Sequence, residues 1–196
     1  MTITKPDYFD RFRCIAGACP DSCCQEWDVQ VDDASARRYL SLPGQLGDTL
    51  RQKLKQDENG EYCLQITDRR CPMWRTDGLC EIQFQLGENG LCQVCREFPR
   101  LRHDYGDFVE LGLELSCPEA ARLILTLPHT MTAEDMPCSE EPEYDADAMT
   151  ILLQSRAVVL DFLDTTSLPV NEVLSVLLFY GHEVQSWLDG GDPATL

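Results

Sequence analysis

The sequence predicts an α+β fold: a mainly helical protein with a small antiparallel β element, in which a cysteine-rich metal- or cluster-binding module is followed by helices. Ten of the eleven cysteines precede residue 131, in a region of short alternating segments and turn signals. After residue 145 come two stretches with apolar residues at helical spacing. We therefore expect the module at residues 1–130, an acidic linker at 131–145, and a helical segment at 146–196 that packs on the module.

Two helices are expected early in the module. The stretch VDDASARRYLSL opens with an aspartate at the N-cap position and continues with helix-forming residues, so residues 33–42 are predicted to be helical. A second helix is predicted after the PG dipeptide, at residues 46–56.

Short strands and one more helix are expected in the rest of the module. EYCLQIT (61–67) and RCPMW (70–74) read as strands, and the turn RTDG follows. LCEIQFQLG (79–87) fits either a strand or a helix, whereas DFVELGLELS (107–116) alternates like a half-buried strand. In SCPEAARLILTL, Ser116 and Glu119 match a capping box, which predicts a helix that starts at Cys117.

The two C-terminal stretches, residues 148–164 and 169–189, are long enough and apolar enough to be helices of the core. The longest apolar runs, such as residues 173–180, are interrupted by polar residues and are shorter than the roughly 20 residues that a bilayer requires, so no membrane association is expected. The N-terminus offers no signal-peptide pattern and the cysteine number is odd, which favours the reducing cytoplasm.

The net charge of −18 is unevenly distributed along the chain. Residues 1–105 hold 17 acids and 14 bases, whereas residues 106–196 hold 17 acids against Arg122 and Arg156 alone. Because phosphate binding relies on Lys and Arg, nucleic acid is not an expected partner. A basic protein partner fits better, although acidity also serves solubility. The oligomeric state cannot be read from the sequence.

Nine cysteines have the spacing of metal ligands. They form C-x4-C-x3-C-C near the N-terminus, a pair that flanks the RTDG turn, a C-x2-C, and one residue that opens a helix. Short spacings let one turn of backbone direct two thiolates at one ion, so these groups predict zinc or an iron–sulfur cluster rather than disulfides. The nine are Cys14, Cys19, Cys23, Cys24, Cys71, Cys80, Cys92, Cys95 and Cys117.

Nine ligands exceed the four that one cluster needs, and if one set must be chosen it is Cys14, Cys19, Cys23 and Cys95. At the start of its helix, Cys117 is expected to be stabilised as a thiolate. The other two cysteines, Cys63 and Cys138, are expected to be buried apolar residues. The three histidines, at 103, 129 and 182, have no partner at ligand spacing.

The cysteine segments resemble a known family. CPDSCCQEWDVQVD, then RCPMWRTDGLCEIQFQLGENGLCQVCREFPR and then LELSCPEAARLIL strongly resemble the flagellin lysine-N-methylase family, and more loosely cysteine-rich proteins described as zinc- or iron-chelating. The match covers about residues 8–127. It implies methyl transfer from S-adenosylmethionine to lysines of flagellin, with a four-iron iron–sulfur cluster (4Fe-4S). Since members of this family are longer, the chain is expected to be a short homologue or an N-terminal portion.

The S-adenosylmethionine site is not of a familiar kind. No strand leads into a G-x-G loop, and the C-x3-C-x2-C pattern of radical enzymes is broken at Glu26. Cofactor-binding candidates are Arg96 and Arg100, which would fork onto a carboxylate or donate to cluster sulfur, or else form structural ion pairs. Trp27 is the third candidate, which would stack on adenine or shield the cluster from water, or else pack in the core.

A lysine attacks a methyl sulfonium only as the neutral amine, so the site needs a group that takes its proton. Catalytic candidates near the cysteines are Glu26, Asp28, Glu81 and Tyr105, with ordinary surface or capping roles as the alternative. Three functions therefore stay open: a cluster-bearing methyltransferase or its cluster-binding portion, a zinc- or iron-chelating structural module without catalysis, and a redox or metal-delivery protein.

Overall fold

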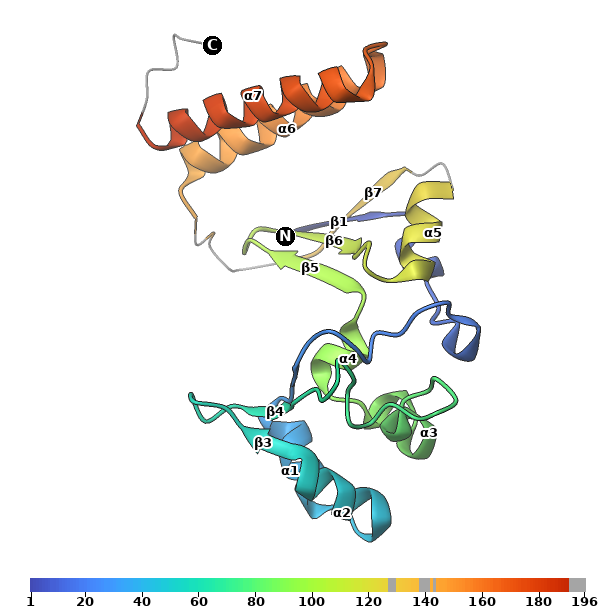
Figure 1. Cartoon of the computed structure of the whole chain (residues 1–196). Helices are drawn as coiled ribbons and strands as arrows, with labels where there is room; N and C mark the ends of the chain where they lie inside the picture. The colour runs from blue at the N-terminus through green and yellow to red at the C-terminus, as the bar shows by residue number, and fades with distance from the viewer. Residues whose placement is uncertain (127–129, 138–141, 143, 191–196) are drawn as a thin grey trace. The chain divides into compact units, whose positions relative to one another are not determined.

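The computed structural model describes residues 1–126, 130–137, 142 and 144–190. These residues form two compact units, one made of Met1–Asp104 with Phe108–Cys138, the other of Tyr105–Asp107 with Ser139–Leu196. The first unit combines helices with a mixed and an antiparallel sheet, so the predicted α+β class is confirmed (Figure 1). The predicted boundaries of module, linker and helical segment stay a prediction.

Helices and strands alternate along the first unit (Figure 1). Its helices are α1 (Asp33–Ser41), α2 (Gly44–Lys53), α3 (Glu81–Leu86), α4 (Gln93–Glu97) and α5 (Pro118–Thr126), and three short 3-10 turns are η1 (Phe9–Arg11), η2 (Ala16–Ala18) and η3 (Glu88–Gly90). Its strands are β1 (Thr2–Pro6), β2 (Val29–Gln30), β3 (Leu54–Gln56), β4 (Tyr62–Leu64), β5 (Arg100–Asp104), β6 (Phe108–Leu113) and β7 (Met131–Asp135).

The larger sheet places the N-terminal strand in its interior. The strand order is β5-β6-β1-β7, with β1 parallel to β6 and antiparallel to β7. β6 is the strand predicted from DFVELGLELS, and its inward-facing Val109 and Leu113 are buried. On this sheet α5 packs Ala120 and Leu123 against Leu113 and the N-terminal Phe12. This contact fixes the start of α5 beside the first cysteine segment.

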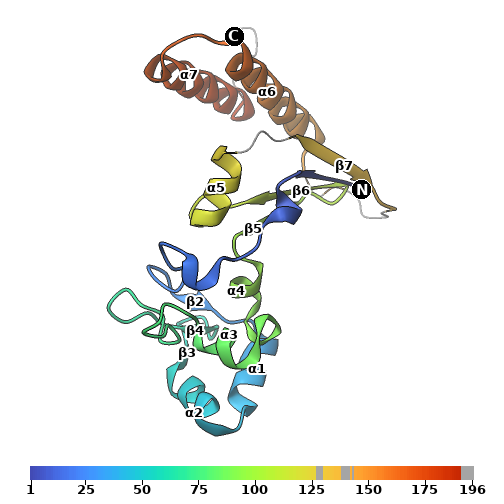
Figure 2. The ribbon, with the colours of Figure 1, turned by 90° about the vertical axis from the view of Figure 1, so that its right-hand side faces the viewer.

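The smaller sheet, β2-β4-β3, supports the cysteine-rich elements together with α1 and α2. Figures 1 and 2 both show β3, β4 and α1–α4 grouped at one end of the first unit, and α4 leading directly into the larger sheet. Tyr39 and Leu50, one from each long helix, are fully buried at the centre of this core beside Met73. The core therefore extends to the 71–80 segment, which carries Cys71 and Cys80.

The helix predicted at 33–42 is confirmed as α1, with Asp32 as its N-cap. The helix predicted at 46–56 was wrong at its end, because α2 stops at Lys53 and residues 54–56 form β3. Leu54 is buried opposite Leu64 across the antiparallel pair, so tertiary packing overrides the local helical propensity.

Two further predictions in the module need correction. Residues 70–74 are not a strand but a turn joined to its neighbours by isolated bridges, including Trp74 to Cys80. The capping box is also absent, since α5 begins at Pro118 and the Ser116 hydroxyl donates to Glu114 at 2.7 Å instead of capping the helix. The ambiguous segment 79–87 contains helix α3.

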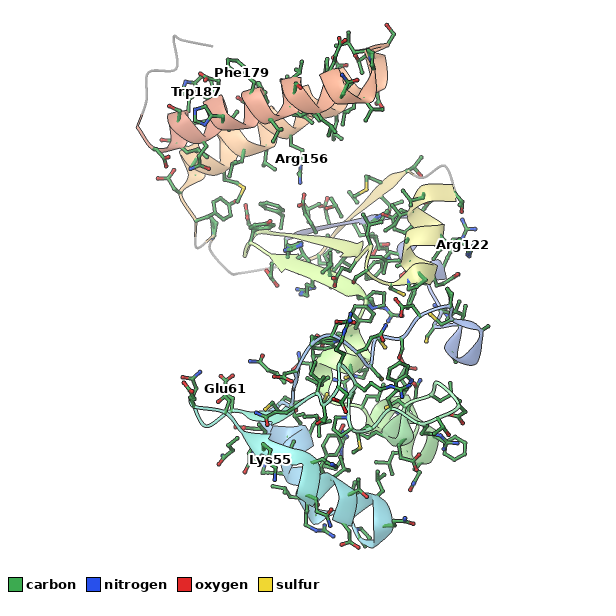
Figure 3. All side chains as sticks on the ribbon, viewed as in Figure 1. Lys55, Glu61, Arg122, Arg156, Phe179 and Trp187 are labelled. Carbon is green, nitrogen blue, oxygen red and sulfur yellow. The ribbon has the colours of Figure 1, made fainter. Side chains whose placement is uncertain are left out.

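The second unit contains α6 (Ala146–Thr165) and α7 (Val170–Leu188), which pack on each other as a hairpin (Figure 3). Both predicted helices are confirmed, and within their own unit only Val184 is buried among the described residues of α6 and α7. Their packing on the module stays a prediction. Within the described residues, neither these helices nor the others are long and apolar enough to cross a membrane.

Candidate metal centre

All nine cysteines predicted as metal ligands line a single cavity of about 480 Å³ in the first unit. They come from four segments, residues 14–24, 71–80, 92–95 and 117, that the fold brings together. The ten cysteines that the structure describes, these nine and Cys63, are all free thiols. The sequence spacing therefore predicted a real convergence in space.

Backbone hydrogen bonds position the first two cysteine segments. The amide of Cys71 donates to the carbonyl of Cys24 at 2.8 Å, which ties the CC dipeptide to the 70–74 turn. The amide of Arg75 donates to Leu79 at 2.9 Å and that of Glu81 to Met73 at 2.8 Å, so the RTDG turn folds the chain back. As a result Cys80 lies close to Cys71.

Four thiols form the centre of the cavity. The Cys24 thiol lies among those of Cys23, Cys71 and Cys80. Interaction with these three neighbours raises the pKa of Cys24 far above its usual range. Interaction with the protonated Cys24 thiol lowers the pKa of Cys23 to about 7 and that of Cys80 to about 6, because a donor beside either sulfur favours its thiolate.

The C-x2-C pair lies at the start of α4. Cys92 and Cys95 share a side-chain hydrogen bond that lowers the pKa of Cys92 and raises that of Cys95. The helix is held by Asp32, whose carboxylate accepts the Ser35 amide of α1 at 2.9 Å and the Gln93 amide of α4 at 2.8 Å. One side chain thus fixes the C-x2-C helix relative to α1.

The loop before Cys92 is also held from α1. The hydroxyl of buried Tyr39 donates to the carbonyl of Gly90 at 2.8 Å, and the Arg38 guanidinium donates to the carbonyls of Gly90 and Leu91. Tyr39 lines the cavity, and burial raises its pKa. The sequence did not single out Tyr39 as a cavity residue, because its position on the apolar face of α1 indicates only that it is buried.

The third group is Cys14, Cys19 and Cys117, on the side of the cavity next to α5. The Cys117 sulfur accepts the backbone amides of Glu119 and Ala120 and so caps α5. The expected thiolate stabilisation is nevertheless outweighed, since burial raises the pKa of Cys117 more than these amides lower it. The prediction of a stabilised thiolate there was wrong.

The chemistry of the donor set fits a thiophilic group. In the part of the chain that the structure describes, no three Cys, His, Asp or Glu side chains are arranged as ligands of one metal ion. The thiols of the group around Cys24 instead interact with one another as free thiols. Clustered thiolates select zinc or iron–sulfur clusters over hard cations. The lining sulfurs are therefore suitable ligands for either group.

The remaining cysteines and histidines lie elsewhere. Cys63 is buried on β4, as predicted for an apolar residue, and it is not among the lining residues of the cavity. Cys138 and His129 lie outside the described residues. His103 and His182 are exposed on β5 and α7.

The three predicted cofactor-binding residues all line the cavity. Trp27 packs against the core and donates its indole N–H to the carbonyl of Cys23 at 2.9 Å. Arg96 follows the C-x2-C pair, and the Arg100 guanidinium lies 5.1 Å from the centre of the Phe12 ring. Two guanidinium groups and an aromatic surface thus face a sulfur-rich cavity.

The predicted catalytic acids are engaged away from the lining of this cavity. Glu26 forms a bidentate ion pair with Arg69, Asp28 accepts the Ile66 amide at 2.7 Å, and Glu81 pairs with Arg75. Tyr105 belongs to the second unit, where its ring packs edge-on against Tyr144 at 6.4 Å.

The acids that do line the cavity are Asp21 and Glu88. Asp21 accepts the amide of Ser22 at 2.8 Å. Sequence reasoning missed both, although the position of Asp21 inside CPDSCC was a signal for it.

Comparison with known proteins settles the family. The chain is 34% identical over 137 residues to the flagellar biosynthetic protein FliU of Salmonella muenchen, which covers 67% of this chain and 81% of that protein. The chain belongs to the flagellin lysine-N-methylase family. Within this family it is 33% identical over 141 residues to the lysine-N-methylases of Salmonella typhimurium and Salmonella choleraesuis.

Those 141 residues are 69% of this chain but 35% of each lysine-N-methylase, so the chain spans about a third of their length. No family model matches the sequence. No solved structure matches it either. Membership of the flagellin lysine-N-methylase family confirms the resemblance carried by the cysteine segments.

Proposed function

We propose that this chain is a flagellin-type protein-lysine N-methyltransferase, or its cluster-binding portion, and transfers methyl groups from S-adenosylmethionine to lysines of flagellin. The nine-cysteine cavity would hold an iron–sulfur cluster of the four-iron type. The observation that carries this proposal is the convergence of nine thiols on one cavity, in a chain whose relatives are named lysine-N-methylases.

The cluster would be held by thiols from the group around Cys24, whose partners are Cys23, Cys71 and Cys80, with the nearby C-x2-C pair as the alternative source of ligands. An iron–sulfur cluster bound there supplies one-electron or Lewis-acid chemistry beside the substrate. Buried Tyr39, Met73 and Leu91 lie on the cavity wall and form its apolar side.

The cofactor's amino-acid end would bind to the guanidinium groups of Arg96 and Arg100. A guanidinium forks onto a carboxylate with two parallel hydrogen bonds, and both residues line the cavity. Trp27 offers the apolar surface on which an adenine stacks. These three residues would orient the methyl group toward the cavity.

The proton of the substrate lysine requires an acceptor within the cavity. The lysine nitrogen bonds to the methyl carbon, the carbon–sulfur bond of the sulfonium breaks, and the lysine's proton passes to a carboxylate. We assign this role to Asp21 or Glu88, because Glu26, Asp28 and Glu81 are engaged outside the lining. An acidic chain with a net charge of −18 also attracts lysine-bearing substrates from solution.

A structural zinc module is the second candidate. Four thiols linked through Cys24 equal the four ligands that a structural zinc ion takes. In that case the zinc ion would stabilise the fold, and the chain would be a metal-binding module that does not catalyse methyl transfer.

The test is to purify the full chain anaerobically, record its visible spectrum, and measure iron, zinc and sulfide. A brown protein with about four irons and four sulfides per chain supports the cluster, whereas a colourless protein with about one zinc overturns it in favour of the zinc module. Cys80→Ala should lose the metal, and Cys63→Ala, buried outside the cavity lining, is the matched control.

Methyl transfer is then measured by mass spectrometry of flagellin after incubation with S-adenosylmethionine. Methylated lysines that disappear in Asp21→Asn with Glu88→Gln support the assigned roles. A fully loaded protein that leaves flagellin unmodified contradicts catalysis by this chain while leaving the metal assignment intact.

A further inference from the structure

The nine cavity thiols fall into two groups that belong to different hydrophobic cores of the first unit. Cys117 packs beside Phe12 and Leu113 in the core under α5. Five other thiols pack in the core of α1, α2 and the smaller sheet, namely Cys24, Cys71, Cys80, Cys92 and Cys95. We call these five, together with Cys23, the inner group. The outer group is Cys14, Cys19 and Cys117.

The sulfur neighbours of the thiols follow the same division. Burial raises the pKa of Cys117, and the charges of Cys19 and Cys14 raise it further. The thiols that act on the pKa values of Cys24 and Cys95 all belong to the inner group. Cys117 therefore has the two other outer thiols as its sulfur neighbours.

Local hydrogen bonds hold the two segments of the outer group at the cavity. The Ala16 amide donates to the Cys14 sulfur at 3.4 Å and the Cys19 amide to the Ala16 carbonyl at 2.9 Å, so the η2 turn folds the loop between these two cysteines. Cys117 is held by the first turn of α5, where its carbonyl accepts the Ala121 amide at 2.8 Å. Cys14 is exposed and the other two outer cysteines are half-buried, so solvent reaches the outer group.

The number of thiols leaves the outer group without a role in the first metal centre. The six inner thiols already exceed the four ligands that one cluster or one structural zinc ion takes. Three thiolates with a fourth position left for water are the donor set of an open zinc site, and thiolates select zinc over hard cations. Arg13, which directly precedes Cys14 and lines the cavity, offsets part of the negative charge of three thiolates.

We propose that Cys14, Cys19 and Cys117 bind a second zinc ion, separate from the group that the inner thiols hold. Within the described residues the three sulfurs are not prearranged around one point, so they converge as the ion binds. Each thiol releases its proton to solvent when its thiolate coordinates the zinc. The ion joins the loop at residues 14–19 to the start of α5. This site stands whether the inner thiols hold an iron–sulfur cluster or a zinc ion.

The test adds zinc to the full chain, purified anaerobically with the group that its inner thiols hold and treated with a weak chelator. Metal is measured by elemental analysis before and after the addition, and thiols that react with iodoacetamide are mapped by mass spectrometry. We expect about one added zinc per chain and alkylation of the three outer thiols slowed by about tenfold or more, because a coordinated thiolate is a weaker nucleophile.

Variants separate the two groups. Cys19→Ser and Cys117→Ser should each lose the added zinc and keep the inner metal, and Cys117→Ser retains an acceptor for the amides at the start of α5. Cys80→Ala should lose the inner metal and keep the added zinc, whereas the control Cys63→Ala should keep both.

Two results would overturn the second site. One is loss of the inner metal in Cys19→Ser or Cys117→Ser with helical content retained by circular dichroism, because outer and inner thiols would then hold one group. The other is alkylation of the outer thiols at the same rate with and without zinc. A colourless protein with protected outer thiols overturns the proposed cluster and supports the second site, and a brown protein with reactive outer thiols does the reverse.

Discussion

The Asp32 carboxylate accepts the Gln93 backbone amide at 2.8 Å, although the two residues are 61 positions apart. Its other oxygen caps α1 through the Ser35 amide. A helix that carries two of the candidate ligands is thereby fixed to the helical core by one side chain.

Replacing Asp32 with alanine should destabilise the first unit by about 2 kcal/mol, because it removes the cap of one helix and leaves the amide of another without its acceptor. Asp32→Asn should cost about half as much, since its single carbonyl oxygen retains one of the two bonds and its amide group faces the other donor. Denaturant unfolding measures both. Equal stability of all three proteins would show that neither bond matters.

The same carboxylate predicts a pH dependence. Hydrogen bonds from Gln93 and Ser35 lower the pKa of Asp32 below its ordinary value. Its contribution to stability is therefore present above the pKa of an unfolded aspartate and is lost as the pH falls through the lower, folded-state value. Thermal unfolding from pH 7 to pH 2 should show a steeper acid loss in the parent than in Asp32→Ala, and parallel curves would contradict this.

Substitutions of Cys117 should distinguish its role as the cap of α5 from its role as a metal ligand. Cys117→Ser keeps an acceptor for the amides of Glu119 and Ala120 and should leave the stability of the metal-free chain within about 0.5 kcal/mol of the parent, whereas Cys117→Ala should lose about 1 kcal/mol. If the residue is also a ligand, both variants should bind less metal than the parent. Urea unfolding of the stripped protein and elemental analysis of the loaded protein give the two results.

Arg75 should control access to Cys80. Its guanidinium pairs with Asp77 at 2.7 Å and Glu81 at 3.2 Å and lies 3.8 Å from the centre of the Phe84 ring, which holds the RTDG turn closed. Arg75→Ala should therefore speed alkylation of Cys80 several-fold. Alkylation mapped by mass spectrometry tests this, with Arg51→Ala, which removes a bridge to Asp48 in α2, as the control that should leave the rate unchanged.

If the cavity holds the proposed cluster or zinc ion, removing that group should lower the unfolding temperature and expose the ligand thiols together. Because thiolate ligands bind metal only when the fold assembles them, chelation withdraws binding free energy from the folded state. The thiols that act as ligands should become reactive toward iodoacetamide, while buried Cys63 stays protected in both states. Reactivity that is unchanged by chelation would show that the cavity binds no metal.

The sequence predicted those features that depend on local pattern. The N-cap of α1, the alternation of β6 and the periodicity of α6 and α7 each lie within one segment, so they were found. β1, β5 and β7 were missed because they are five residues each, and β1 pairs with partners more than 100 positions away. Residues 54–56 were assigned to a helix because nothing local records that Leu54 packs on Leu64.

The candidate site was predicted through its cysteines and less well through its other groups. Ligand spacing is a local property, and it identified all nine lining thiols. The partners of Glu26, Asp28 and Glu81 lie in other turns of the chain, so their engagement was hidden, as was the approach of Glu88 to the cavity. Which thiols could bind the same metal ion or cluster also depends on tertiary structure, because the 71–80 turn is what brings Cys80 close to Cys71.

The interior position of β1 sets an order of events during synthesis. β1 pairs with β6 and β7, which come more than 100 residues later in the chain, so during synthesis it has no partner until residues 108–135 have emerged. The core of α1, α2 and β2–β4 is complete by residue 92, well before that point. Eight of the nine cavity cysteines are thus translated before the sheet can close and before Cys117 arrives, so their thiols stay accessible during synthesis for longer than those of a cavity built from one continuous segment.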